Sequence, residues 1–209
     1  MNLFTQLSQH ARIQPETIAY TSRHRIASYR KLWSRIERAT ARLQAEWGIK
    51  SGDAVAYCGQ GHPDALVLYV ALLRCGALLV PLEHPSLQKR INEIARVVEL
   101  KIILHDDHAP IQHIDAAAMI APISALIMTR CPYQPSCILE DPSHPGLIRI
   151  DAAQDAALHS EQKSLLQITA AASACADPAR RIAGFLFDAE ILGGVVLPAL
   201  MAGRTLDFA

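Results

Sequence analysis

The chain has 209 residues, with 20 basic and 20 acidic residues and no formal net charge at pH 7. This balance gives no electrostatic reason to expect binding to nucleic acid or to an anionic membrane. Hydrophobic residues make up 51% and charged residues 19%, which is typical of a globular protein and excludes a disordered or fibrous chain. We therefore expect a single domain over residues 1–209.

The cysteines and the first residues favour a cytoplasmic location. The cysteines are odd in number and form no C-x-x-C pair, as expected for reduced thiols: Cys58, Cys75, Cys131, Cys137 and Cys175. The first six residues lack the basic and apolar regions of a secretion signal. The apolar stretch from Ala65 to Leu82 approaches the length of a membrane span, but Arg74, Gly76 and Pro81 interrupt it. A buried helix that runs into a buried strand explains these interruptions better, so we expect no membrane association.

Helical and strand patterns alternate from residue 29 onward. Apolar residues at spacings of three and four predict an amphipathic helix from Tyr29 to Trp47. Ser28 is a suitable N-cap and Gly48 a suitable C-terminal stop for this helix. Ala54 to Cys58 is then a short run typical of a strand.

Two further helix–strand units follow. A helix begins at Pro63, where proline is tolerated in the first turn, and ends before Gly76. Ala77 to Val80 is the next strand, and the apolar residues at 87, 91, 94 and 98 predict another helix before a strand from Lys101 to Leu104. This alternation with short turns predicts an α/β fold, with a parallel sheet and helices on both faces.

The pattern weakens after Asp106. Six prolines interrupt residues 109–146, so we expect an irregular connection over residues 108–146. Five elements are predicted after it: strand 147–150, helix 156–175, strand 185–187, helix 191–202 and strand 204–208.

Three segments resemble the adenylate-forming ligases, which include acyl-CoA synthetases and peptide-synthetase adenylation domains. Residues 28–32, S-Y-R-K-L, are similar to the family motif (T/S)-Y-x-E-L, and residues 48–56, G-I-K-S-G-D-A-V-A, to G-(I/V)-x-x-G-D-x-V-A. Residues 72–82, L-L-R-C-G-A-L-L-V-P-L, resemble L-x-x-G-A-x-x-V-P-L. The order and spacing of the three make residues 1–107 the strongest part of the resemblance. It implies a fold like the N-terminal subdomain of these ligases and activation of an acyl or aryl acid with ATP and Mg²⁺.

The resemblance fails at the phosphate-binding loop. In the family, a strand leads into a loop of the form T-S-G-(T/S)-T-G-x-P-K-G, whereas residues 151–155 here read D-A-A-Q-D. A phosphate loop aims backbone N–H groups at anionic oxygens, and it uses glycine for close approach and lysine for charge. Asp151 and Asp155 would instead repel a triphosphate. We therefore expect no bound cofactor, although the family resemblance alone implies ATP and Mg²⁺.

Residues 147–209 are a degenerate continuation of the family pattern. F-L-F-D at 185–188 and the run from Leu197 to Leu206 resemble later family segments. The acyl pocket and the residues around adenine and ribose lie beyond these segments in the family. The resemblance therefore assigns no catalytic, cofactor-binding or metal-binding residue to any position of this sequence.

Three other groups of residues suggest a metal site, a dinucleotide loop and an acid–base pair, and each group also has a simpler structural explanation. His105, Asp106, Asp107 and His108, with His113 nearby, are possible metal ligands, but a polar loop after a strand uses the same residues. Gly59-Gln60-Gly61 lacks the third glycine of a dinucleotide loop, because Asp64 occupies that place, and fits a strand-to-helix turn. Asp151 and Asp155 could form an acid–base pair, although exposed carboxylates are far more common.

The sequence thus leads to two main hypotheses. The first is a truncated ligase-like domain without adenylation activity of its own, a pseudoenzyme that serves as an accessory or interaction module beside a companion ligase, a carrier protein or another biosynthetic enzyme. The alternative is one chain of a split acid–CoA or acid–carrier ligase that forms an acyl-adenylate with a partner chain. A small-ligand binder without turnover and a decayed remnant also remain open, because fold alone does not supply function.

Overall fold

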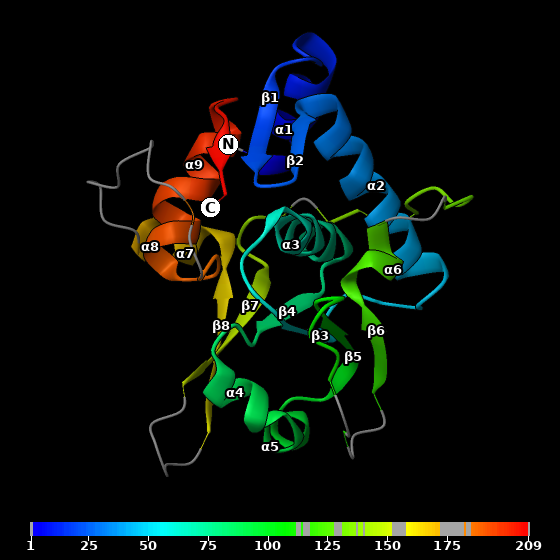
Figure 1. Cartoon of the computed structure of the whole chain (residues 1–209), viewed down its shortest axis with the longest axis vertical. Coiled ribbons are helices and arrows are strands. Elements are labelled where there is room, and N and C mark those ends of the chain that lie inside the picture. The colour runs from blue at the N-terminus through cyan, green and yellow to red at the C-terminus, as the bar shows by residue number, and fades with distance from the viewer. Residues whose placement is uncertain are drawn as a thin grey trace.

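The computed structural model describes residues 2–111, 114, 118–127, 131–136, 138–139, 141–151, 158–171, 182 and 185–208. Six strands form the main sheet, in the order β6-β5-β3-β4-β7-β8 (Figure 1). Five of them run parallel: β3 (Ala54–Cys58), β4 (Leu78–Pro81), β5 (Leu100–His105), β6 (Met119–Pro122) and β7 (Pro145–Asp151). The edge strand β8 (His159–Ser164) is antiparallel to β7.

Helices cover both faces of this sheet. Side chains alternate along a strand, so Val55 and Tyr57 belong to one apolar layer while Ala54 and Ala56 belong to the other. The first layer lies under α3 (Pro63–Cys75) and α6 (Ile123–Ile127), with α2 (Tyr29–Ala45) packed on α3. The second lies under α4 (Pro85–Lys89) and α5 (Ile91–Val97), on the opposite side in Figure 1. The predicted α/β fold with a parallel sheet and helices on both faces is confirmed.

The capping residues explain why the central elements were predictable. The Ser28 hydroxyl accepts a hydrogen bond from the Lys31 N–H at 3.5 Å, as predicted for the start of α2. Helix α3 begins at Pro63 and ends at Gly76, whose φ of 68° lies in the left-handed region. Glycine adopts that conformation without strain, so it stops the helix and lets β4 begin two residues later.

A second, three-stranded sheet joins the two ends of the described chain. Its order is β2 (Arg25–Ser28), β1 (Ile18–Ser22) and β9 (Leu206–Asp207), with β1 antiparallel to β2 and parallel to β9. Helix α1 (Leu3–Ile13) packs against α2 and α9 (Leu197–Met201). No helix or strand was predicted before Tyr29, and the last strand was predicted at 204–208, so this sheet was not anticipated.

Three predictions about the second half of the chain are wrong. Residues 159–164 belong to the strand β8, not to a helix over 156–175, because their backbone pairs with β7; the helix α7 (Leu165–Ala171) begins only afterward. Residues 185–187 form a turn rather than a strand. The expected irregular connection over 108–146 contains β6 and α6, whose residues 119–127 are mostly apolar.

The predicted helix over 191–202 is present with a wider turn in its middle. It consists of α8 (Ala189–Ile191), the π-helix η1 (Leu192–Val196) and α9. Pro198 has no N–H to donate to the preceding turn, and Gly193 and Gly194 permit the wider turn. The predicted helix through residues 87–98 is likewise divided, at Arg90, into α4 and α5.

The apolar stretch over residues 65–82 forms all of α3 except its first two residues, the two-residue link that follows, and β4, and almost all of its side chains are buried. Within the described residues, no helix is both long and apolar enough to cross a membrane. The thiols of Cys58 and Cys75 are buried and Cys131 is partly exposed, while Cys137 and Cys175 lie outside the described residues.

Candidate functional site

The order of the strands singles out one place at the carboxyl edge of the main sheet. From β3 the chain continues to β4 on one side, whereas β5 pairs with the other side of β3. The connections after β3 and β5 pack on opposite faces, and open α/β sheets bind their ligands at such a switch point. A cavity of about 610 Å³ lies there, between these two connections and the turn of the β1–β2 hairpin.

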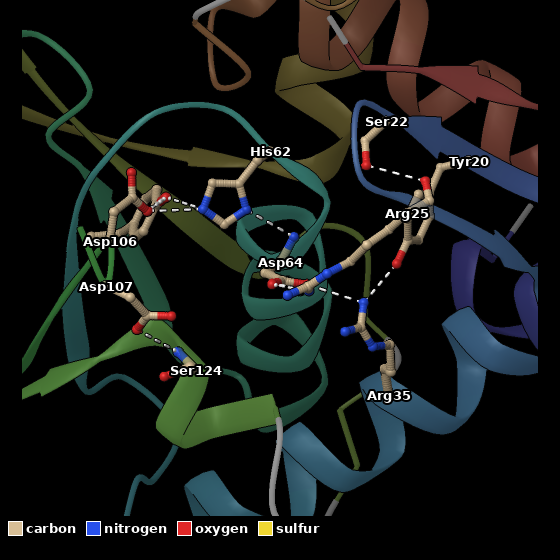
Figure 2. Close-up of polar contacts among 10 residues, drawn as sticks. Tyr20, Ser22, Arg25, Arg35, His62, Asp64, Asp106, Asp107 and Ser124 are labelled. Atoms are coloured by element: carbon tan, nitrogen blue, oxygen red, sulfur yellow. Dashed lines mark hydrogen bonds and ion pairs between the residues drawn. The ribbon is translucent and has the colours of Figure 1, made fainter. Parts of the chain in front are cut away.

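Asp106 organises the wall of this cavity where β5 ends (Figure 2). Its Oδ1 accepts hydrogen bonds from the Tyr57 hydroxyl and from His62 Nε2, the latter at 2.8 Å. Its Oδ2 accepts from the Gln60 backbone N–H at 2.9 Å. Burial alone would raise the pKa of Asp106, but the hydrogen bonds from His62, Tyr57 and Gln60 outweigh it and hold this pKa below its ordinary value.

His62 has both ring nitrogens engaged. Nδ1 accepts the Asp64 backbone N–H at 3.1 Å, so the proton of the neutral ring lies on Nε2, which donates to Asp106. His62 could therefore take a proton from a substrate only by giving up its cap on α3. A general base needs a free acceptor within reach of its substrate, so this network fixes a loop rather than supplying a base.

Gly59 is required by the same network. A Cβ at this position would lie 2.4 Å from the Tyr57 hydroxyl oxygen and 2.5 Å from Asp106 Oδ1. The residues Gly59 to Gly61 form the connection from β3 to α3, so the glycine serves the close approach of Tyr57 and Asp106.

The opposite wall of the cavity carries a second ionic cluster (Figure 2). Arg25 Nη1 lies 2.8 Å from Asp64 Oδ2, and Arg35 Nη1 lies 3.0 Å from Asp64 Oδ1. Arg35 also donates to the Tyr20 hydroxyl at 2.6 Å. Because Asp64 sits at the start of α3 and Arg25 in β2, the cluster ties the hairpin to the main sheet.

The possible metal ligands do not converge. His105 is buried and donates through Nδ1 to the Asp106 carbonyl at 2.8 Å, while the Asp107 carboxylate accepts from the Ser124 N–H at 3.4 Å. His108 lines the cavity, and His113 lies outside the described residues. In the described part of the chain, no three His, Cys, Asp or Glu side chains are grouped as a metal site would require.

The edge that corresponds to the phosphate loop lies at the other side of the sheet. Residues 152–157, which include Asp155, lie between β7 and β8 and outside the described residues. Asp151, the last residue of β7, pairs with Arg149 at 3.3 Å, and both side chains are more than half exposed. Because Asp155 lies outside the described residues, the acid–base pair of Asp151 and Asp155 stays a prediction.

A smaller pocket of about 180 Å³ lies beside this edge, between β4, β7 and residues 185–188. Glu83 forms part of its wall, and its two carboxylate oxygens accept the backbone N–H groups of Leu186 and Phe187 at 2.8 and 3.0 Å. These contacts explain why residues 185–187 form a turn, since their N–H groups bond to a side chain and not to a neighbouring strand. Glu83 was not predicted from the sequence, because no local pattern indicates a contact across more than 100 residues.

Residues 7–162 match the AMP-binding enzyme family. The chain belongs to this family. Among curated relatives, the D-alanine–D-alanyl carrier protein ligase of Bacillus licheniformis is 26% identical over 116 residues, which are 56% of this chain and 23% of the relative. The indoleacetate–CoA ligase of Aromatoleum aromaticum is 34% identical over 82 residues, which are 39% of this chain and 16% of the relative. The chain thus spans well under half the length of these relatives.

Solved structures agree with the family at the level of the fold. The o-succinylbenzoate CoA synthetase of Bacillus subtilis has a TM-score of 0.79 at 14% identity, and the match covers 100% of this chain and 44% of that one. The N-terminal subdomain of Klebsiella oxytoca NpsA, solved with 3-hydroxyanthranilyl-AMSN, has a TM-score of 0.77 at 19% identity and covers 100% and 54%. The described chain therefore has the fold of the N-terminal subdomain of adenylate-forming ligases, as the sequence motifs predicted.

Proposed function

We propose that this member of the AMP-binding enzyme family does not activate an acid on its own and serves in the cytoplasm as an accessory or interaction module. The observation that carries the proposal is the segment between β7 and β8. It joins two paired strands, as a phosphate loop would, yet residues 151–158 contain no glycine and no lysine and carry two aspartates.

Electrostatics supports the loss of ATP binding. Two unit charges about 4 Å apart interact with roughly 4 kcal/mol at an effective dielectric constant of 20, and between Asp151 and a phosphate this interaction is repulsive. Arg149 compensates only in part, because the pair is exposed and screened by solvent. The glycines that let backbone N–H groups approach the phosphates closely are absent from residues 151–158.

Two observations support association with another protein. Leu166 in α7 and Phe185 just before α8 are about half exposed, and α7 contacts α8. Apolar side chains in such positions favour a protein contact. A related Klebsiella oxytoca protein with a TM-score of 0.77 and 19% identity is an artificially fused adenylation–PCP di-domain. A carrier protein, a companion ligase or another biosynthetic enzyme is therefore the class of partner we propose.

Thermal unfolding with and without Mg·ATP tests the proposal. A ligand at about 100 times its Kd adds roughly 2.7 kcal/mol to stability, which for a chain of this size raises Tm by about 5–10 °C. We expect no rise for this chain. A full-length relative with an intact phosphate loop is the positive control, and the double variant D151N/D155N shows whether charge alone prevents binding. A rise of several degrees for the unchanged chain would contradict the proposal.

A split ligase is the second candidate, and one observation favours it. An isolated N-terminal subdomain of NpsA was solved with an AMSN ligand, so in that protein the subdomain alone holds a ligand. If this chain works with a partner that supplies phosphate-binding groups, a mixture of the two would catalyse ATP–pyrophosphate exchange. The absence of exchange in every mixture with candidate carrier-dependent or CoA-dependent ligases would exclude this candidate.

A further inference from the structure

The cavity at the carboxyl edge of the main sheet has an apolar floor. Its volume of about 610 Å³ is within the range of sites that bind small organic molecules. Pro63, Ile123 and Phe208 line it, and all three side chains are buried, so they lie at its bottom and not at its mouth. They come from the start of α3, from α6 and from the end of β9. The floor can therefore bury the apolar part of a ligand.

Exposed basic side chains form the mouth of the same cavity. Arg23 and His24 lie in the turn of the β1–β2 hairpin, and His108 follows β5 on the wall formed by the main sheet. Among the residues that the structure describes, these three side chains form no hydrogen bond or ion pair. Arg25 contacts Asp64 through Nη1, which leaves its Nη2 and Nε groups available. The mouth thus presents unused N–H donors of two guanidinium groups and two imidazole rings.

The carboxylates that line the cavity are, with one exception, engaged by donors of the chain itself. Asp64 accepts from Arg25 and Arg35 at 2.8 and 3.0 Å, and the buried Asp106 accepts from the three donors described above. The exception is Asp107, which is exposed and accepts a long hydrogen bond of 3.4 Å. The hydrogen-bonding capacity left for a ligand therefore consists mainly of donors, which suits an anion.

The hairpin that carries these donors is held in place by the rest of the fold. Figure 2 shows Arg25 of β2 and Arg35 of α2 reaching Asp64 at the start of α3, and Arg35 also donates to the Tyr20 hydroxyl at 2.6 Å. The parallel pairing of β1 with β9 is a second attachment. A ligand that binds to a fixed hairpin does not have to order it first, so more of its interaction energy appears as affinity.

We propose that this cavity binds a small organic phosphate monoester, with the phosphate at Arg23 and Arg25 and the organic part on the apolar floor. Such a phosphate carries roughly two negative charges at pH 7 and three acceptor oxygens. It therefore matches two guanidinium groups better than a carboxylate does, which has one charge and two oxygens. The inference is independent of the proposed function, because the cavity contains no residue of the segment between β7 and β8 and needs no partner chain.

An NMR titration of the full chain with phenyl phosphate, at constant pH and without metal ions, tests the proposal. We expect saturable shifts of the His24, Gly61 and His108 amides, with a Kd of about 1 mM or below. Inorganic phosphate lacks the organic part and benzyl alcohol lacks the charge, so each should bind at least about tenfold more weakly. Equal binding of either compound, or tighter binding of the cation benzylamine, would overturn the proposal.

Matched variants show whether the mouth of the cavity is responsible. R23Q should weaken the binding of phenyl phosphate about tenfold without changing Tm, because Arg23 is exposed and its side chain has no partner among the described residues. Arg96 is exposed on α5, which covers the other face of the sheet, so R96Q makes the same change outside the cavity and should leave binding unchanged.

The remaining carboxylate gives a prediction of opposite sign. D107N removes a negative charge from the wall of the cavity and should tighten the binding of phenyl phosphate about two- to threefold. Weaker binding in D107N, equal losses in R23Q and R96Q, or no shifts in the unchanged chain at about 10 mM phenyl phosphate would each contradict an anion site.

Discussion

Replacing Asp106 with alanine should lower the free energy of unfolding by about 3 kcal/mol. The substitution leaves the Gln60 N–H without its acceptor, in a place where Asp106 itself is only 2% exposed. His62 Nε2 loses the carboxylate and keeps only the weaker acceptor at 2.9 Å, the Tyr57 hydroxyl oxygen. Tyr57 keeps one alternative acceptor, the Gln60 carbonyl at 2.9 Å. In urea, a loss of this size corresponds to a fall of about 1.5 M in the unfolding midpoint.

The neighbouring residue supplies the control for this experiment. Asp107 is exposed and accepts a long, 3.4 Å hydrogen bond from the Ser124 N–H, so D107A should change stability by no more than about 0.5 kcal/mol. The pH dependence adds a second readout. The pKa of Asp106 is lowered in the folded chain, so its stabilisation is present above the ordinary aspartate pKa of about 4 and is lost as the pH falls below it. D106N should lack this acid-induced loss, and equal losses in D106A and D107A would show that the network does not stabilise the fold.

Truncating Leu72 to alanine should lower the free energy of unfolding by about 3–4 kcal/mol. Leu72 is completely buried in α3, which packs against α2 and α6 as well as β4 and β7. These elements enclose the position of the Leu72 side chain. None of them can move into the space left by the truncation without displacing its neighbours. The expected fall in Tm is about 10 °C, measured by thermal unfolding followed by circular dichroism.

Two matched variants distinguish a cavity from a general loss of hydrophobicity. L72M keeps most of the volume and should cost less than about 1.5 kcal/mol. Ile13 at the end of α1 is 77% exposed, so I13A should change stability by at most about 0.5 kcal/mol. A similar loss in L72A and I13A would argue against α3 as the centre of the core.

The central fold could be predicted because its signals are local. Ser28, Pro63 and Gly76 begin or end their helices through contacts within a few residues, and they were assigned correctly. The strand at 159–164 was missed because H-S-E-Q-K-S has no apolar alternation. Its conformation depends on pairing with β7, which a periodicity argument does not include.

The candidate site was likewise predictable only where its signals are local. The loop residues after β3 and β5 were noticed one segment at a time, but their meeting at the Asp106 network depends on β5 lying beside β3. Glu83 was not noticed at all, because its partners Leu186 and Phe187 contribute only backbone N–H groups, which any residue carries. The family motifs, by contrast, predicted the fold correctly. The loss of ATP binding stays a prediction, since Asp155 lies outside the described residues.

The pairing of β1 with β9 has a consequence for biosynthesis. The main sheet uses residues 54–164, so it can assemble on the ribosome before the last part of the described chain has emerged. Strand β1, although made first, must wait for Leu206 and Asp207 to reach its free edge. Until then the β1–β2 hairpin presents an unpaired strand to the crowded interior of the cell. Capture of nascent chains by chaperones should therefore end only when residues 206–208 leave the exit tunnel.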